Sequence, residues 1–388
     1  MKIQFIHNYY QRKGGEDNVV ANEVGLLESK GHDVQLYSVH NDQIFGLVNK
    51  VKTVLNVNRS RHQELLLYDY LSERMPDVVH VHNFFPLITP VVFDVCRRLS
   101  LPSVMTLHNY RLICAGGMLM RNEVPCELCL TGSAYQAVRH KCYKNSIIGS
   151  ATVSHMVNHH KTKKTWETKV TRFIALTEFA RSRFVKAGFP EERVLVKPNF
   201  IEADALENSA EIRQGALFVG RVSGEKGVTN LVEAWEDVEI SLTIAGDGPL
   251  LHSLPRNARI HYAGSVPHDR IIELMRTAEV LIVPSLWYEG FPMVLVEAFS
   301  QGLPVIASRL GGLAEVVEHG VTGLHFEAGD AKDLAKKVRW MYEHPEERRQ
   351  MGVNARRVYE TKYTAEQNYL VMMEIYQQAI DDEKSVIL

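Results

Sequence analysis

The chain lacks several features that would each define a class of protein. No run reaches the roughly 20 consecutive apolar residues of a membrane-spanning helix. The first residues, Met1–His7, enter a strand pattern directly, without the apolar core and cleavage site of a signal peptide. A formal net charge of -2 over 388 residues gives no electrostatic argument for a nucleic-acid partner. We therefore predict a cytoplasmic protein that binds no nucleic acid.

Two short ligand-binding motifs are also missing. No Asp-x-Asp occurs in the chain, so a metal ion that clamps a diphosphate is not indicated, and we predict no cofactor for catalysis. Gly14 and Gly15 follow the first strand pattern but do not complete the Gly-x-Gly-x-x-Gly fingerprint of dinucleotide binding. A glycine pair still lets backbone N–H groups approach a phosphate closely. A plain flexible turn is the alternative.

Cysteine is scarce, yet four of the five cysteines gather between positions 114 and 142. The four are Cys114, Cys126, Cys129 and Cys142. A Cys-x-x-Cys pair places two thiolates on one turn, which is a common half of a tetrahedral zinc site. We expect a structural zinc that holds this loop; an iron–sulfur cluster, a redox pair and free thiols are the alternatives. The fifth, Cys96, lies on an apolar helix pattern and is expected in the core.

Length and composition indicate two globular domains. A chain of 388 residues exceeds one ordinary hydrophobic core, and 45% hydrophobic with 23% charged residues is typical of a soluble protein. Strand, loop and helix patterns alternate in both halves, so each half is predicted to be a doubly wound, Rossmann-like α/β domain. In such sheets ligands bind at the carboxyl ends of the strands. We place the first domain at 1–200 with a cysteine-rich insertion at 109–145, the second at 201–363, and a last helix at 364–388.

The most informative stretch is 289–297, which follows the strand pattern Val280–Val283. Two carboxylates, Glu289 and Glu297, bracket a turn and the start of an apolar helix. The unpaired N–H groups and positive dipole of a helix start suit a phosphate, and ionised carboxylates suit the diols of a sugar or ribose. The alternative is that Glu289 caps the helix and Glu297 lies on its solvated side.

Three further positions carry candidate chemistry. Arg221 and Lys226 lie on a glycine-containing loop after a strand pattern, and their charges fit a diphosphate; salt-bridged surface residues are the alternative. His108 stands at the carboxyl end of another strand pattern, where a reacting group belongs, although a histidine that caps the strand is also consistent. His80 and His82 point to one side of a third strand, as cleft residues or as a metal pair.

The spacing of Glu289 and Glu297, with Gly-Phe-Pro after the first, resembles the signature of family-4 retaining glycosyltransferases of the GT-B fold, and the order of the other motifs extends this resemblance over nearly the whole chain. The resemblance implies two domains that face each other across a cleft, with the donor on the second and the acceptor mainly on the first. It implies that Arg221 and Lys226 neutralise the leaving diphosphate and that His108 contacts the transferred sugar.

The expected site follows from both arguments. The catalytic candidates are His108, Arg221, Lys226 and Glu289. The donor-binding candidates are Gly14, Gly15, Arg221, Lys226, Gly290, Phe291, Pro292, Met293, Val294 and Glu297. The partners implied are a nucleotide-diphosphate sugar and a glycan or lipid-linked acceptor, in cell-surface polysaccharide synthesis. A nucleotide-sugar epimerase and a non-catalytic sugar-nucleotide binder remain alternatives.

The segment 146–169 is predicted to be helical, with a basic side that includes Lys161, Lys163 and Lys164. Basic residues near an anionic bilayer favour binding, so this side is a candidate for peripheral contact at the inner face of the membrane. A solvated helix face is the alternative.

Overall fold

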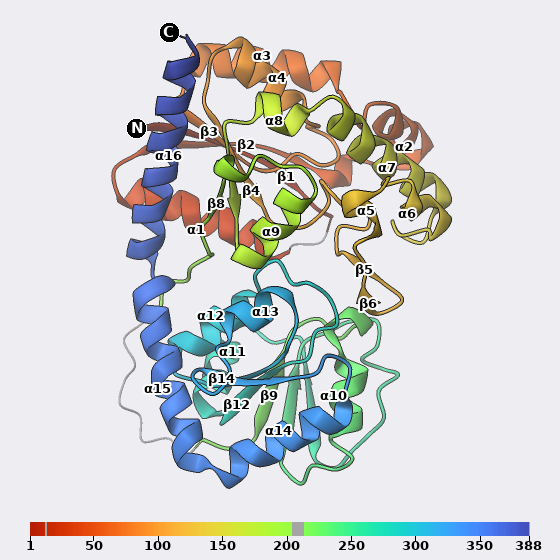
Figure 1. Cartoon of the computed structure of the whole chain (residues 1–388), viewed down its shortest axis with the longest axis vertical. Coiled ribbons are helices and arrows are strands. Elements are labelled where there is room, and N and C mark those ends of the chain that lie inside the picture. Colours follow the sequence, from red (N-terminus) through yellow and green to blue (C-terminus); the bar gives the residue numbers. More distant parts are fainter. Residues whose placement is uncertain (12–13, 204–212, 388) are drawn as a thin grey trace. The chain divides into compact units, whose positions relative to one another are not determined.

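The computed structural model describes residues 1–11, 14–203 and 213–387, and it divides the chain into two compact units (Figure 1). Unit 1 comprises Met1–Leu119, Glu127–Asn199 and Asn368–Leu388, and unit 2 comprises Met120–Cys126 and Phe200–Gln367. The short segment Met120–Cys126 therefore groups with unit 2, whereas the sequence analysis assigned all of 109–145 to the first domain. Most of the predicted linker at 202–213 lies outside the described residues.

Unit 1 is built on a six-stranded parallel sheet in the order β2-β1-β3-β4-β7-β8. The strands are β1 (Lys2–Tyr9), β2 (Asp33–His40), β3 (Val78–Asn83), β4 (Ser103–Leu107), β7 (Arg172–Ala175) and β8 (Val194–Val196). All residues of β3 and β4 are buried, as expected for central strands of a parallel sheet that is covered on both faces. The order reverses between β1 and β3, so the carboxyl ends of these strands form a topological switch point.

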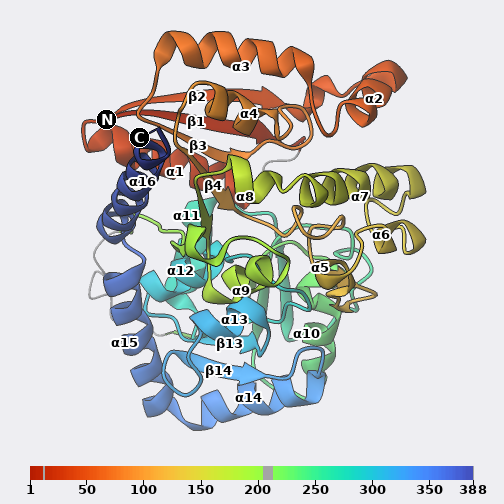
Figure 2. The ribbon, with the colours of Figure 1, turned by 45° about the horizontal axis from the view of Figure 1, so that its top comes forward.

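The helices of unit 1 connect these strands and cover the sheet (Figures 1 and 2). The longer ones are α1 (Gly15–Ser29), α2 (Gly46–Leu55), α3 (Arg61–Arg74), α4 (Val91–Arg98), α7 (Ile147–Thr162), α8 (Thr165–Lys169), α9 (Glu178–Lys186) and α16 (Ala365–Ile387). Short elements lie in the cysteine-containing segment: β5 (Met120–Arg121), β6 (Val124–Pro125), α5 (Leu128–Thr131) and α6 (Gln136–Arg139).

The predicted helical segment 146–169 consists of two helices. α7 ends at Thr162, and α8 starts after Lys164, whose φ of 50° lies in the left-handed region. The buried ring of His160 bonds the hydroxyl of Thr165 at 2.9 Å and so fixes the corner. The prediction that 146–169 is helical is thus confirmed, and the break at Lys164 was not predicted because no glycine or proline marks it in the sequence.

Unit 2 repeats the architecture, with a six-stranded parallel sheet in the order β11-β10-β9-β12-β13-β14. The strands are β9 (Ala216–Val219), β10 (Leu242–Ala245), β11 (Ile260–Gly264), β12 (Val280–Val283), β13 (Val305–Ser308) and β14 (Gly323–Phe326). The helices are α10 (Val228–Ala234), α11 (His268–Thr277), α12 (Met293–Ser300), α13 (Gly311–Val316), α14 (Ala331–Glu343) and α15 (Pro345–Lys362). Its core includes Phe218, Trp235, Ile282, Ile306 and Phe326.

The order of this second sheet reverses between β9 and β12, which pair through Ala216 and Val280. The predicted doubly wound α/β class is thus confirmed in both units. No helix in the described part of the chain is both long enough and apolar enough to span a bilayer.

Candidate functional site

The predicted donor residues of unit 2 gather at the carboxyl ends of the two strands that flank its switch point. Arg221 follows β9, and Glu289 follows β12. Loops from these two strands are the usual place for a ligand in an open α/β sheet. The sequence therefore placed Arg221 and Glu289 at strand ends correctly, because each motif directly follows a recognisable buried strand.

Glu289 is the centre of this group and is only 4% exposed. Its Oε1 accepts hydrogen bonds from the Lys226 ammonium and the Ser285 hydroxyl, each at 2.6 Å. The Lys226 ammonium also lies 5.9 Å from the ring centroid of Trp287. Two residues that were predicted to bind different parts of a donor are therefore bonded to each other. Because an ammonium has three donors, the bond to Glu289 orients Lys226 and leaves further donors for a ligand.

The backbone keeps Lys226 next to Glu289. Lys226 ends a short 3-10 turn, Gly224–Lys226, and Gly227 follows with a φ of 69°. A Cβ at Gly227 would lie 1.9 Å from the carbonyl oxygen of Pro284, just after β12. The amide of Leu286 also donates to the Glu225 carbonyl at 2.9 Å. Only glycine permits this close approach of the two loops.

The start of α12 lies in the same loop as Glu289. Pro292 is its N-cap residue, and the first amides, those of Met293 and Val294, occupy positions that have no acceptor within a helix. The ring of Phe291 is buried and meets Tyr363 edge-on, with 5.7 Å between centroids. The side chain of Phe291 thus anchors the turn, so any contact of this residue with a sugar donor would be made by its backbone.

Arg221 and Glu297 complete the group predicted for unit 2. The Arg221 side chain is exposed. Glu297 lies within α12, and burial raises the pKa of its carboxyl, an effect that the nearby His268 opposes. His268 Nδ1 is 3.9 Å from Glu297 Oε1. A ligand that donates hydrogen bonds to Glu297 would favour its ionised form.

In unit 1, the predicted glycine loop is tied to the end of β1. Gly14 is the N-cap of α1, and its N–H donates to Asp17 Oδ2 at 2.8 Å. The other carboxylate oxygen of Asp17 lies 2.8 Å from His7 Nε2. Burial lowers the pKa of His7 to about 4, while the bond to Asp17 acts against this shift. At neutral pH a neutral His7 therefore donates to Asp17 and holds the helix start against the strand.

A second polar group lies beside this loop and was not predicted from the sequence. Burial raises the pKa of Glu16 to about 8, although the charge of Arg111 opposes it. Asn83 donates to the Glu16 carboxyl at 3.2 Å. The Arg111 guanidinium lies over the rings of Phe85 and Tyr143, at 4.7 and 5.5 Å. A pKa of about 8 favours the protonated form of Glu16 at neutral pH, which reduces negative charge next to Gly14.

His108 follows β4 as expected, and a buried chain of side chains extends behind it. Its Nε2 lies 2.9 Å from His82 Nδ1, and His82 Nε2 lies 3.4 Å from Glu23 Oε2. The other Glu23 oxygen accepts from the Lys197 ammonium at 2.7 Å. Glu23, His82 and Lys197 are buried, whereas His108 is half-buried.

The charges of these buried residues determine which of the side chains behind His108 carry protons. Burial and the neighbouring His82 hold the pKa of His108 well below its usual range. Burial acts to raise the pKa of Glu23, but Lys197 and His82 outweigh it and hold that pKa well below its usual range. An ionised Glu23 favours the His82 tautomer with hydrogen on Nε2, so His82 Nδ1 accepts from His108 Nε2–H. His108 is then left with Nδ1 as a hydrogen-bond acceptor.

The metal-pair alternative for His80 and His82 does not fit this arrangement, although Glu23, His80 and His82 lie close enough to share an ion. Both ring nitrogens of His80 are engaged, with the hydroxyls of Tyr376 at 2.7 Å and Thr106 at 2.8 Å. The Lys197 ammonium on Glu23 would also repel a cation. His80 is therefore a structural residue, and His82 belongs to the chain behind His108.

The four predicted zinc ligands are divided between the two units, because Cys126 belongs to unit 2 and the other three to unit 1. Within unit 1, a Cβ built on Gly116 would lie 3.8 Å from Cys114 Sγ and 3.5 Å from the Cβ of Cys142. Cys114 and Cys142 thus lie near the same glycine, although no group of ligand atoms close enough to share an ion includes a cysteine among the described residues. The zinc site stays a prediction. Cys96 is fully buried, as expected for a core residue.

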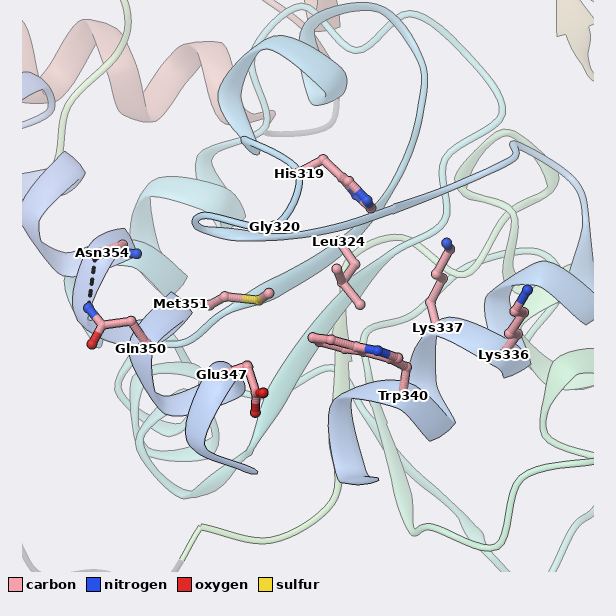
Figure 3. Close-up of a pocket in the computed structure, with 10 residues that line it drawn as sticks. All are labelled: His319, Gly320, Leu324, Lys336, Lys337, Trp340, Glu347, Gln350, Met351 and Asn354. Carbon is pink, nitrogen blue, oxygen red and sulfur yellow. Dashed lines mark hydrogen bonds between the residues drawn. The ribbon is translucent and has the colours of Figure 1, made fainter. Parts of the chain in front are cut away.

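A separate hollow of about 520 Å³ lies in unit 2 along α14, α15 and the edge strand β14 (Figure 3). Leu324, Trp340 and Met351 supply its apolar wall, and Lys337 and Glu347 extend from the flanking helices. None of the predicted donor residues lines it. The hollow is therefore separate from the group of predicted donor residues at the ends of β9 and β12.

Comparison with known proteins identifies relatives over the whole length. The family model described as Glycosyltransferase Family 4 matches residues 13–205, and that described as Glycosyl transferases group 1 matches residues 202–358. An uncharacterized glycosyltransferase of Methanocaldococcus jannaschii is 31% identical, covering 98% of this chain and 99% of its own. The alpha-D-kanosaminyltransferase of Streptomyces kanamyceticus is 28% identical over 50% of this chain and 57% of its own. Among solved structures, Anabaena HepE in complex with UDP superposes with a TM-score of 0.64 at 19% identity, over 99% of this chain and 100% of that one.

Proposed function

The chain belongs to the group 1 and family-4 glycosyltransferases, and from this premise we propose that it moves a sugar from a nucleotide-diphosphate donor to a glycan or lipid-linked acceptor with retention of configuration. We further propose that catalysis needs no metal ion and serves cell-surface polysaccharide synthesis at the inner face of the membrane. The observation that carries the proposal is the buried Glu289 carboxylate bonded to Lys226 at the switch point of unit 2. The UDP bound by Anabaena HepE supports a uridine or similar nucleotide as the donor's carrier.

Transfer requires that the bond from the anomeric carbon to the diphosphate breaks, which puts negative charge on the leaving group. Lys226, Arg221 and the first amides of α12 can stabilise this charge. Charge-assisted hydrogen bonds contribute about 1.5–3 kcal/mol each, and about 1.4 kcal/mol changes a rate tenfold. Bonds that strengthen as charge develops therefore supply a large part of the catalysis. The lack of an Asp-x-Asp motif favours this metal-free arrangement.

The carboxylates suit the hydroxyl groups of the donor. Glu289 would accept from hydroxyls of the transferred sugar while it orients Lys226, and Glu297 would accept from the ribose diol. His108 would accept a sugar hydroxyl at Nδ1, the nitrogen that its bond to His82 leaves available. By resemblance, the leaving phosphate takes the acceptor's proton.

An assay of nucleotide release tests the proposal against its rivals. The protein is incubated with a panel of nucleotide sugars, with and without membrane lipid extract, and the anomeric configuration of the product is read by NMR. We expect release that depends on the extract and a retained configuration. An isomerised donor would instead identify an epimerase, and binding without turnover on every acceptor would identify a non-catalytic binder.

Substitution of Lys226 links the activity to the site. Lys226→Ala removes the ammonium on Glu289 and is expected to lower kcat by about a hundredfold or more. Lys332→Ala, an exposed lysine of the same unit, is the matched control and is expected to leave kcat unchanged. A loss below threefold in Lys226→Ala would break the assignment of Lys226.

A further inference from the structure

The helix α2 of unit 1 presents its apolar side to solvent. Phe45, Leu47 and Leu55 are 86%, 78% and 78% exposed, and Val48, Val51 and Val54 are also exposed. No residue of the helix is buried. A surface helix of a globular protein normally turns its apolar stripe inward, so α2 has the reverse orientation.

The helical period of about 3.6 residues explains why the apolar side chains of α2 lie on one side of the helix. At 100° per residue, the apolar residues of α2 fall within one sector of about 120°, and Lys50 and Lys52 lie at its two borders. Thr53, which is half-buried, falls on the opposite side and faces the body of unit 1. An apolar sector bordered by lysines is the pattern of a helix that lies in a membrane interface, where the stems of lysine reach past apolar surface toward headgroups.

The charge around α2 is of one sign. Between Asp42 and Glu64 the sequence contains Lys50, Lys52, Arg59 and Arg61 and no carboxylate, and of these four residues Arg59 pairs with Glu64 at 2.8 Å. This positive segment is complementary to an anionic lipid surface. A second apolar group lies at the start of α7, where Ile147 and Ile148 are exposed. Both ribbon views place α2 and α7 at the same end of unit 1 (Figures 1 and 2).

The basic side predicted for 146–169 is less suited to this role. Lys161 donates to the carbonyl of Leu130, Lys169 pairs with Asp94, and Lys164 pairs with Glu167. Lys161, Lys164 and Lys169 thus have partners within unit 1. Lys50 and Lys52 differ from the exposed Lys161, Lys163 and Lys164 because they border an exposed apolar surface.

We propose that α2 docks unit 1 onto an anionic lipid bilayer, with Leu47, Val51 and Leu55 in the interface and Lys50 and Lys52 at the headgroups. This inference deepens the proposed function, since it names the surface that meets the membrane, but binding to lipid requires no turnover and is tested separately.

The test is co-sedimentation with large vesicles of phosphatidylcholine containing 30% phosphatidylglycerol. We expect binding that weakens as salt is raised. Each lysine near such a surface contributes roughly fivefold to partition, so Lys50→Gln/Lys52→Gln is expected to lose about 25-fold. Leu47→Ser/Val51→Ser is expected to lose at least tenfold without loss of folding, because both side chains are exposed.

The controls use comparable residues elsewhere. Val353→Ser removes an exposed apolar side chain of unit 2, and Lys163→Glu changes an exposed charge next to α7; both are expected to bind vesicles normally. Equal binding of the α2 variants and wild type would overturn the proposal. A second outcome would also overturn it: the wild-type protein does not bind vesicles but forms a dimer that Leu47→Ser/Val51→Ser disrupts. In that case α2 would contact a second copy of the chain. Nucleotide release with a water-soluble acceptor should stay unchanged in the α2 variants, and its failure in wild type would count against the proposed function alone.

Discussion

Replacing Lys197 with methionine removes the ammonium from a pair that is fully buried in unit 1. Lys197 Nζ donates to Glu23 Oε1 at 2.7 Å and lies 3.2 Å from Asn368 Oδ1. Methionine retains much of the volume, so the main effect is an unpaired carboxylate at Glu23. Removal of one partner of a buried pair costs about 3–5 kcal/mol. We expect the free energy of opening unit 1 to fall by that amount.

The assay is native-state hydrogen exchange of the β1 and β3 amides, which reports unit 1 separately from unit 2. Glu23→Gln/Lys197→Met is the informative control, because it removes both charges. Neutral replacement of a buried pair is often close to neutral in stability, so the double variant should recover most of the loss. A single variant that loses less than 1 kcal/mol, or a double variant no better than the single, would refute the reasoning.

The same pair gives a pH dependence with a defined sign. The pKa of Glu23 in the folded protein lies well below 4.5, because Lys197 and His82 outweigh the effect of burial. The unfolded chain therefore binds more protons just below pH 4.5, and stability falls as the pH falls. The contribution of Glu23 is fully present above pH 4.5 and is lost toward its folded pKa. The part of the loss of stability at acid pH that comes from Glu23 should be absent from Glu23→Gln/Lys197→Met.

Three further predictions concern other parts of the chain. Gly246→Ala should destabilise unit 2 by about 3 kcal/mol, because φ is 151° and a Cβ would lie 1.8 Å from the Gly220 carbonyl oxygen. Gly25→Ala, in open space on α1, is the control and should not destabilise unit 1. Urea unfolding of both variants measures the two changes in stability. Glu16, with a pKa of about 8 against an ordinary 4.5, makes unit 1 less stable as pH rises between these values, and Glu16→Gln should remove that slope in thermal scans at stepped pH. Purified protein should carry about one zinc per chain by elemental analysis, and a metal-free preparation that folds and turns over normally would exclude the zinc site.

The sequence predicted the strands and the loops that follow them because each has a local signal. The apolar runs at 78–82 and 280–283 correspond to β3 and β12, and Lys226 and Glu289 could be placed at strand ends from their position in the chain alone. That the two would bond each other could not be predicted, since the close approach of Gly227 to Pro284 depends on how two distant loops pack.

The chain of residues behind His108 was missed for a different reason. The apolar residues Val19, Val20, Val24, Leu26 and Leu27 by themselves indicate an inner side of α1 that contains no glutamate. Glu23 is fully buried and Val24 only partly so. Glu23 does lie one turn from both Val19 and Leu27, so helical spacing alone would have placed it on the buried face. Its partner Lys197 is 174 positions away, and nothing in the sequence connects the two.

The C-terminal helix has a consequence for how the protein is made. Tyr376 and Asn368 of α16 contact His80 and Lys197, so the polar interior of unit 1 is complete only once the final residues are present. Unit 2, apart from Met120–Cys126, is encoded between these parts. All residues of the second lobe are therefore joined to the chain before the closing segment of the first is made. A released chain truncated before Asn368 should yield a protease-resistant second lobe and a protease-sensitive first one.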